Sequence, residues 1–316
     1  MLEHRVNTNA PCHLADYLPT VFPRLTRGMV YRFGKEKRIR CNGTHITGAD
    51  RIKTGDLLAL YLPPELLEQP TGPVYLLARD ELQPVYEDDA LLIADKPAGL
   101  LVEDETGKTP DTLINRVLRY LDVRGELGDQ SRFLPCLCHR LDAGTSGLVL
   151  IAKTARSRDL LMEAIRLRQI QKTYLCVTFG HPQPAAGTLR GYLVKDAQRG
   201  LVRVINRPQF GARQIITGYR TLANSGRLSL LEVDLITGRT HQIRAHLASI
   251  GCPLVGDSKY GNQSINRSLR AKYQLLCAWK LSFPQFDEPL LRQISGRQFT
   301  AKDPWFYRQI LEKTLR

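Results

Sequence analysis

Two short segments bounded by glycines bring together side chains that could do chemistry. The first, residues 139–147, reads His-Arg-Leu-Asp-Ala-Gly-Thr-Ser-Gly and places Asp142 two residues after an arginine. A carboxyl group with an ordinary pKa of about 3.9 is ionised at neutral pH, so Asp142 needs no neighbouring base before it acts as a nucleophile or as a base. The alternative for this segment is an exposed arginine–aspartate pair beside a loop, because such pairs are common and contribute little stability.

The second segment, residues 237–246, reads Thr-Gly-Arg-Thr-His-Gln-Ile-Arg-Ala-His. It predicts a helix that is capped by Thr240 and ended by Gly251. Residues three apart on a helix share a face, so we expect His241 and Arg244 to point the same way. The alternative is a basic helix end that contacts phosphate without taking part in chemistry.

Other catalytic patterns are absent from the sequence. Residues 144–147 lack the Gly-x-Ser-x-Gly spacing of a nucleophile elbow. His241 and His246 are five residues apart with no glutamate between them, which excludes the zinc-protease pattern, and no glycine-rich loop for a nucleotide occurs. Cys136 and Cys138 lie close together, but no second cysteine pair completes the four ligands of a structural zinc. We therefore expect no cofactor and no metal.

The composition indicates a globular protein with a polyanionic partner. The chain has 316 residues, 43% of them hydrophobic, and a formal net charge of +14. Such an excess of positive charge favours nucleic acid or an anionic membrane as partner. The longest apolar runs fall far short of the ~20 residues of a membrane span, and the first residues lack the apolar core of a signal peptide. We therefore expect no membrane association and a reducing cytoplasm, in which the seven cysteines stay unpaired.

Changes in composition divide the chain into three predicted parts. Residues 1–62 form a small basic module, with a helix-like stretch and an Asn-Gly hairpin turn. Residues 63–78 begin with a proline-rich stretch that is typical of a linker. Residues 79–316 mix strands and helices irregularly, which favours an α+β fold over a regular alternation of strand and helix. The predicted strands are 91–94, 147–152, 172–179 and 228–236, and the predicted helices are 111–121 and 158–169.

These motifs together resemble the signature of the RluA-type RNA pseudouridine synthases. Residues 139–147 resemble its central motif, and residues 85–102, with their Lys-Pro-x-Gly turn, resemble its first. Residues 172–174 (Lys-Thr-Tyr) are similar to a Lys-x-Tyr motif, and residues 238–244 resemble the third motif, which continues in residues 251–261. The resemblance implies a catalytic domain with a mixed, largely antiparallel central sheet flanked by helices.

The resemblance also implies a reaction and a set of site residues. A uridine within RNA is isomerised to pseudouridine on a flipped-out base, without a cofactor because the change is redox-neutral. Asp142 corresponds to the catalytic aspartate, which would attack the sugar or the base or act as a base. Arg244 corresponds to the arginine paired with it, Tyr174 to the aromatic ring against the uracil, and Arg140 to the arginine that enters the RNA. The other residues expected to bind substrate are His139, Thr145, Lys172, Arg239, His241 and Lys96.

The basic N-terminal module is similar to a small αL-motif RNA-binding domain named for a ribosomal protein. It departs from that pattern where Phe33-Gly34 is expected to interrupt the helix after Thr26-Arg27. Because synthases with such a module commonly act on the large ribosomal subunit, we expect its ribosomal RNA as the partner of a monomeric enzyme, with transfer RNA as the alternative target. A non-catalytic RNA-binding or ribosome-assembly factor would explain the charge, but it would not require Asp142, Tyr174 and Arg244 together.

Overall fold

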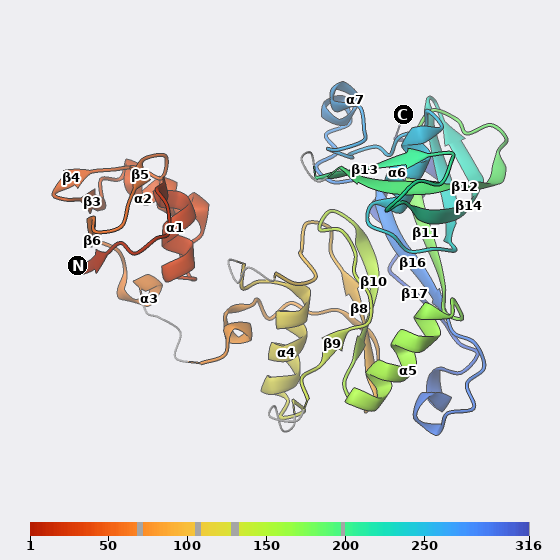
Figure 1. Cartoon of the computed structure of the whole chain (residues 1–316), viewed down its shortest axis with the longest axis horizontal. Coiled ribbons are helices and arrows are strands. Elements are labelled where there is room, and N and C mark those ends of the chain that lie inside the picture. The colour runs from red at the N-terminus through yellow and green to blue at the C-terminus, as the bar shows by residue number, and fades with distance from the viewer. Residues whose placement is uncertain (68–71, 105–108, 128–132, 197–199, 316) are drawn as a thin grey trace. The chain divides into compact units, whose positions relative to one another are not determined.

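The computed structural model describes residues 1–67, 72–104, 109–127, 133–196 and 200–315. The chain forms two compact units, one of Met1–Asp80 with Glu103–Tyr120 and the other of Glu81–Val102 with Leu121–Arg316 (Figure 1). The predicted linker, 63–78, includes residues 68–71, which lie outside the described residues. None of the helices in the described ranges combines the length and the apolar character that a membrane crossing requires.

The first unit contains a small sheet packed against two helices. Leucine, isoleucine and phenylalanine side chains from both layers form its core, among them Leu14, Leu18, Phe33 and Ile39. The sheet has the strand order β1-β6-β3-β4, and β2 pairs with β5 beside it. The elements are β1 (Leu2–Arg5), β2 (Cys12–His13), α1 (Leu14–Val21), α2 (Arg27–Lys35), β3 (Ile39–Cys41), β4 (Thr44–His45), β5 (Arg51–Ile52) and β6 (Leu57–Leu60).

The predicted interruption of the second helix is wrong, because α2 runs through Phe33 and Gly34 to Lys35. Phe33 is buried in the core of the module. Gly34 lies against the next loop, where an added Cβ would come within 2.7 Å of the Thr47 Cα. The glycine therefore permits a close approach of helix and loop, at a small cost in helix propensity.

Three further elements follow in this part of the sequence, namely α3 (Pro64–Leu67), the 3-10 helix η1 (Val74–Leu77) and α4 (Leu113–Val123). The helix predicted over 111–121 is thus confirmed with a shift of two residues. Arg116 on α4 donates two hydrogen bonds to Asp111, at 2.7 and 2.8 Å, and Arg79 forms an ion pair with the same carboxylate at 3.5 Å.

The second unit is built on one large mixed sheet with the strand order β13-β12-β14-β15-β11-β16-β10-β8-β7. Its pairings are antiparallel apart from the parallel pair β10–β16, so the predicted α+β class with a largely antiparallel sheet is confirmed. Its strands are β7 (Pro84–Glu87), β8 (Leu91–Lys96), β9 (Cys136–Leu137), β10 (Ser146–Ala152), β11 (Gln171–Phe179), β12 (Ala186–Asp196), β13 (Leu201–Ile205), β14 (Arg213–Ser225), β15 (Leu228–Leu235), β16 (Leu276–Ser282) and β17 (Gln298–Thr300).

The predicted strands are those whose two faces are both buried. β8, β10, β11 and β15 consist mostly of buried residues, which is typical of central strands. The long strands β12 and β14 were not predicted. Half of β12 alternates between exposed and partly buried residues, and glycine and arginine interrupt its apolar pattern, so its sequence carries a weaker strand signal.

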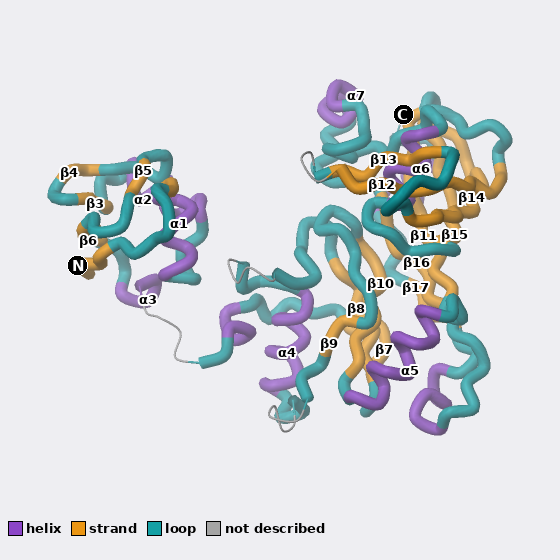
Figure 2. The backbone as a smooth tube through the Cα atoms, viewed as in Figure 1, coloured by secondary structure: helices purple, strands orange, loops and turns teal. Residues whose placement is uncertain are grey.

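Helices pack against this sheet and position its loops (Figure 2). α5 (Ala155–Arg166) lies against β10 and begins with a capping box in which Thr154 and Ser157 bond each other's backbone amides. α6 (Gln242–Ser249) packs against β13 and β14. The remaining elements are α7 (Gln263–Ser268), the 3-10 helix η2 (Pro289–Ile294) and α8 (Trp305–Leu311).

Candidate active site

Asp142 lies on the loop between β9 and β10, whose backbone is closely constrained. The Thr145 amide donates to the Asp142 carbonyl oxygen at 3.0 Å, which closes a turn just before β10 begins. Gly147 has a φ of +105°, and a Cβ there would lie 2.2 Å from the Ala278 carbonyl oxygen of the parallel partner strand. The glycine is therefore required for β10 to pair with β16 directly after the loop.

A buried lysine supports the same loop from the neighbouring turn. Lys96 is fully buried, and its Nζ donates to the carbonyl oxygens of Pro97, Leu100 and Ala143 at 3.0, 2.7 and 3.1 Å. Burial lowers the pKa of Lys96 to about 7, against the opposing charges of Asp142 and Asp95. Since the contacts of its Nζ are to backbone carbonyls, Lys96 positions the loop, and the predicted influence on substrate would be indirect.

Arg244 projects from α6, the helix predicted from residues 240–250. The helix begins at Gln242, and its N-cap is His241 in a left-handed conformation with φ of 53°, so the predicted Thr240 cap is wrong. The first turn is held instead by Thr237, whose hydroxyl donates to the Gln242 side-chain oxygen at 2.9 Å. Gly251 ends the helix with φ of +77°, as predicted.

Three charged side chains form an ionic triad of Asp142, Arg244 and Asp257. Arg244 Nη1 donates to Asp142 Oδ2 at 2.6 Å, while its Nε and Nη2 donate to the two carboxylate oxygens of Asp257 at 2.7 and 2.8 Å. Asp257 is fully buried, whereas the Asp142 side chain remains 27% exposed. The buried bidentate pair therefore fixes the guanidinium and leaves one N–H edge for the accessible carboxylate.

Backbone amides complete the hold on Asp257. The amides of Lys259 and Tyr260 donate to Asp257 Oδ1 at 2.8 and 3.0 Å. Burial alone would raise the pKa of Asp257, but Arg244 and these two amides keep it below its ordinary value, so the carboxylate stays charged. Asp257 is not among the site residues predicted from the sequence, although it lies within the 251–261 motif, in a Gly-Asp pair shortly before Lys-Tyr-Gly.

His241 and Tyr260 border the triad. His241 Nε2 lies 3.9 Å from Asp142 Oδ1, and its Nδ1 is 3.0 Å from the Tyr260 hydroxyl. The Tyr260 ring lies beneath the Arg244 guanidinium at 5.3 Å, and its hydroxyl accepts a hydrogen bond from the Val202 amide at 2.9 Å. Burial lowers the pKa of His241, and the charge of Asp142 opposes that shift. His241 and Arg244 therefore face the same carboxylate, as expected, although His241 precedes the helix on which the expectation rested.

Tyr174 lies on β11 close enough to Asp142 for the carboxylate charge to act on it. The ring is buried, and burial, together with the charges of Asp142 and Cys277, raises the pKa of its hydroxyl, which keeps its proton at neutral pH. The pairing of β11 with β16 shifts register between Thr173 and Tyr174. Such an irregularity re-aims a side chain and is frequent beside active sites.

The other predicted site residues differ in their burial and in their hydrogen-bond partners. His139 Nε2 accepts a hydrogen bond from the Leu150 amide at 3.2 Å, and burial and the nearby Lys172 lower the pKa of His139 to about 3. Burial also lowers the pKa of Lys172, and Thr145 is buried and accepts a hydrogen bond from Gln274 at 3.1 Å. Arg140 and Arg239 are exposed.

Sequence and structure comparisons identify the family. A family model described as RNA pseudouridylate synthase matches residues 90–249, about half of the chain, a range that includes Asp142, Tyr174 and Arg244. The chain belongs to the RNA pseudouridylate synthase family. It is therefore an isomerase that modifies RNA, and the resemblance found in the motifs is confirmed.

Individual members of the family match over almost the whole chain. Ribosomal large subunit pseudouridine synthase C of Rickettsia felis is 34% identical over 96% of both chains, and an uncharacterized RNA pseudouridine synthase of Mycoplasma pneumoniae is 32% identical over 90% of both. The solved structure of human RNA pseudouridylate synthase domain containing 4 superposes with a TM-score of 0.58 at 24% identity, covering 73% of this chain and 92% of that one. The human structure shows a shared fold.

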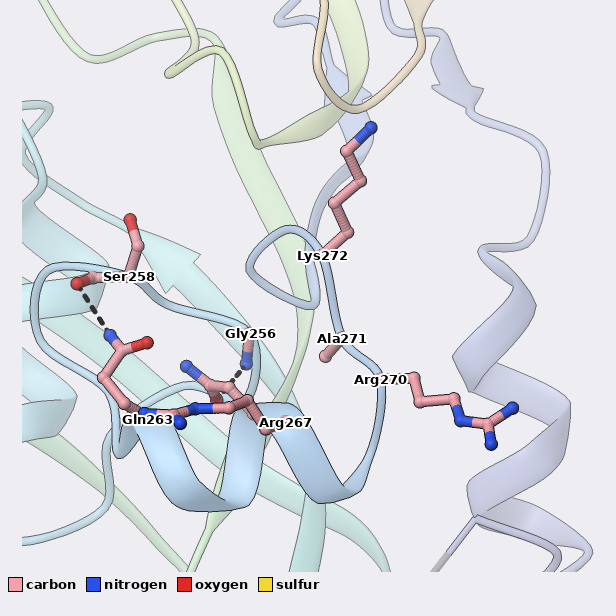
Figure 3. A pocket seen from close by; sticks show the side chains of 8 residues that line it. Gly256, Ser258, Gln263, Arg267, Arg270, Ala271 and Lys272 are labelled. Carbon is pink, nitrogen blue, oxygen red and sulfur yellow. Dashed lines mark hydrogen bonds between the residues drawn. The ribbon is translucent and has the colours of Figure 1, made fainter.

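Two cavities lie near the triad of this family member without containing Asp142. One, of about 350 Å³, is lined by eight residues between Gly256 and Lys272, which include the two neighbours of Asp257 in the sequence, Gly256 and Ser258. Figure 3 shows that its Arg267, Arg270 and Lys272 side chains point in different directions, so they do not converge on one anion. The other, of about 400 Å³, is lined by Lys96 and Trp305 among others. Asp142 instead reaches the open surface.

Among the described residues no group of three or more histidine, cysteine, aspartate or glutamate side chains could hold a metal ion. The accessible reactive group of the triad is the carboxylate of Asp142. Asp142 is held by a cation, partly exposed, and bordered by a protonated tyrosine and a histidine, which suits nucleophilic attack or proton abstraction on a substrate at the surface.

Proposed function

We propose that this protein converts uridine to pseudouridine in large-subunit ribosomal RNA, with Asp142 as the catalytic carboxylate. The ribosomal target is supported by the relatives named ribosomal large subunit pseudouridine synthase C, which align with nearly the whole chain. A net charge of +14 supports a long polyanion as substrate.

The ionic triad is the observation that carries this proposal. Arg244 is fixed by the buried Asp257 and donates to Asp142 Oδ2 at 2.6 Å, so the partly exposed carboxylate is held in place. Preorganised charge of this kind costs no rearrangement when the reaction takes place. A surface arginine that only binds phosphate would not need a second, fully buried carboxylate behind it.

The reaction needs no more than this carboxylate supplies. The bond between N1 of uracil and C1′ of the ribose breaks, the base turns, and a bond forms between C5 and C1′. The proton on C5 is lost and N1 gains one, so atoms and electrons balance without an oxidant or reductant. Asp142 would assist by attack on the sugar or the base, or by taking a proton.

Other residues of the site would hold the RNA. Tyr174 would lie against the uracil face, since a base that has left its helix loses its stacking partners. Exposed Arg140, two residues before Asp142, would enter the space that the base vacates. Arg239, Lys172 and His241 would contact the flanking backbone. We further propose that the enzyme acts as a monomer in the cytoplasm. Size-exclusion chromatography of the purified protein tests whether it is a monomer.

Pseudouridine mapping of cellular RNA, with and without this protein, tests the proposal. We expect one or a few uridines of large-subunit ribosomal RNA to lose the modification when the gene is deleted and to regain it on complementation. Loss confined to transfer RNA would correct the target, and no change in any RNA would contradict the proposed activity.

The variant Asp142→Asn tests the catalytic residue. It keeps the side-chain shape but removes the charge, so we expect turnover to fall at least about a thousandfold, which corresponds to about 4 kcal/mol of barrier. Pseudouridine formation by the purified protein is measured together with RNA affinity and the circular dichroism spectrum, which should stay unchanged. Asp159→Asn, at an exposed carboxylate on α5, is the matched control. Turnover of Asp142→Asn within tenfold of wild type would exclude Asp142.

A further inference from the structure

One aromatic ring of the second unit stands away from the rest of the protein. Phe210 lies in the loop between β13 and β14, and its relative exposure of 104% means that the ring makes almost no contact with the chain. The Ala212 amide donates to the Gln209 carbonyl oxygen at 3.0 Å, so residues 209–212 form a closed turn. Gly211 has φ of +77°, as the third residue of a type II turn requires.

The turn exposes the Phe210 ring to solvent, where the ring does not stabilise the fold. Burial of a phenyl ring is favourable, and Phe210 forgoes it completely. A turn of this type accepts a polar residue in the second position, so the turn itself does not require phenylalanine. Large aromatic side chains on a surface contribute chiefly to recognition.

The surroundings of Phe210 favour an RNA partner over a protein partner. Residues 206, 207 and 209, next to it in the sequence, are polar and exposed. The sequence from residue 200 to 231 contains five arginines and no aspartate or glutamate. Of these arginines, Arg203, Arg207 and Arg213 lie nearest in sequence to the ring and are exposed. An aromatic ring among cations is the composition that binds single-stranded RNA, where bases stack on the ring and phosphates meet the charges.

The base of the loop is tied to the candidate active site. β13 packs on α6, where Val202 shares a small apolar cluster with Ala245, next to Arg244. The Val202 amide also donates to the Tyr260 hydroxyl at 2.9 Å, the hydroxyl that meets His241. Phe210 follows Val202 by eight residues, so its backbone lies within about 29 Å of that contact. An RNA strand at Asp142 can therefore extend to the ring.

We propose that Phe210 stacks on an unpaired base of the RNA substrate, outside the nucleotide that is modified. The ring would fix the strand at a second point while Arg203, Arg207 and Arg213 follow its phosphates. This proposal rests on the proposed function for the identity of the partner. It implies that the β13–β14 loop helps the protein to bind unpaired RNA more tightly than duplex RNA.

The test compares Phe210→Ala, Phe210→Leu and Phe210→Trp in the full chain. Binding of a fluorescein-labelled single-stranded 20-nucleotide RNA is measured by anisotropy at several salt concentrations, with a duplex of the same sequence alongside. Stacking on one base corresponds to roughly five- to 150-fold in affinity. We expect about tenfold weaker single-strand binding for Phe210→Ala and Phe210→Leu, near-wild-type binding for Phe210→Trp, and an unchanged salt dependence because no charge is removed.

The matched control is Leu167→Ala, which removes another exposed apolar side chain, at the end of α5, and should bind RNA like the wild type. Equal affinity of wild type and Phe210→Ala would overturn the proposal, as would equal loss in Phe210→Trp. A concentration-dependent dimer of the wild type that Phe210→Ala abolishes would instead assign the ring to a protein interface. Because binding needs no turnover, an inactive wild type that still shows the Phe210 effect would contradict the proposed function alone.

Discussion

Arg244 has two partners with different surroundings, and this difference determines what each carboxylate can do. Asp257 is fully buried and takes two of the guanidinium's hydrogen bonds, whereas the more accessible Asp142 takes one. Two carboxylates around one arginine give the triad itself a net charge of about −1, whereas the whole chain carries +14. Arg244 therefore links a fully buried carboxylate to a partly exposed one.

Asp257→Asn is expected to reduce both activity and stability. The substitution removes the charge that fixes the guanidinium, and breaking a buried ion pair costs about 3–5 kcal/mol in the free energy of unfolding. Turnover at saturating RNA should fall at least about tenfold, because Asp142 loses its fixed partner. Urea denaturation and single-turnover kinetics measure the two effects. Full recovery of the rate at saturating RNA would show that Asp257 serves RNA binding and not Asp142.

His139 should make the protein sensitive to acid. Its folded pKa of about 3 lies below the ordinary value of about 6.5, so between these pH values the unfolded chain binds a proton that the folded protein does not. Stability is therefore present above pH 6.5 and is lost as the pH falls toward 3, by up to about 1.4 kcal/mol per pH unit. We measure the free energy of unfolding by urea denaturation at several pH values. We expect it to change less with pH between 3 and 6.5 for His139→Gln, whose amide oxygen can accept the Leu150 hydrogen bond, than for the wild type. His45→Gln, at an exposed histidine, is the control. If the free energy of unfolding changed equally with pH in both variants, His139 would not be the source of the acid sensitivity.

At the scale of elements, the site depends on how a loop enters a strand. The loop that carries Asp142 leads directly into β10, which pairs with β8 on one side and with β16 on the other. Lys96 at the end of β8 and the Gly99 amide both donate to the Ala143 carbonyl oxygen. β8 and the turn that follows it thus hold the backbone next to Asp142.

Gly147→Ala tests the entry into β10. Its Cβ would overlap the Ala278 backbone in addition to the strained positive φ, so we expect a loss of at least about 3 kcal/mol in the free energy of unfolding. Gly125→Ala is the matched control, because Gly125 has φ of +71° but nothing within 4 Å of an added Cβ. That variant should lose only about 1 kcal/mol. Equal losses in chemical denaturation would show that the close approach of β10 to β16 is unimportant.

At the scale of the whole molecule, charge and modularity determine how RNA is bound. The first unit carries exposed Lys35, Lys37, Arg38 and Arg40 beside the turn that ends α2. We propose that residues 1–62 add RNA affinity as a separate module, with the catalytic residues in the rest of the chain. Arg119 on α4 donates to the Leu76 and Ala78 carbonyl oxygens, so residues from about 73 onward belong with that helix.

A fragment of residues 73–316 should therefore fold and keep its turnover while binding RNA more weakly. Each lost phosphate contact reduces the slope of log affinity against log salt by roughly 0.7–0.9. Filter binding at several salt concentrations compares the fragment with the full chain. A fragment that folds with an unchanged slope would show that the basic module does not touch RNA, and one that fails to fold would show that the module stabilises the rest.

The sequence alone determined the family and predicted the candidate catalytic residues, because both depend on short motifs. The motifs in residues 139–147 and 238–244 predicted Asp142 and Arg244 as site residues. Continuous apolar runs predicted the strands whose two faces are both buried. Helix spacing predicted that His241 and Arg244 share a side; both lie beside Asp142, although His241 precedes the helix as its N-cap. Motifs, apolar runs and helix spacing are all properties of short stretches of sequence, so they can be recognised without the fold.

Only the tertiary structure decided which distant groups complete the site. Asp142 and Asp257 are 115 positions apart, and their union on one guanidinium depends on how β10, α6 and the loop before α7 pack together. Whether Lys96 meets substrate or backbone depends likewise on burial, which its Lys-Pro motif does not contain. The exposure of Phe210 was equally invisible in sequence, since an apolar residue between polar neighbours can be a core contact or a projecting ring. Burial is a property of what packs around a residue, and that is determined by the whole fold.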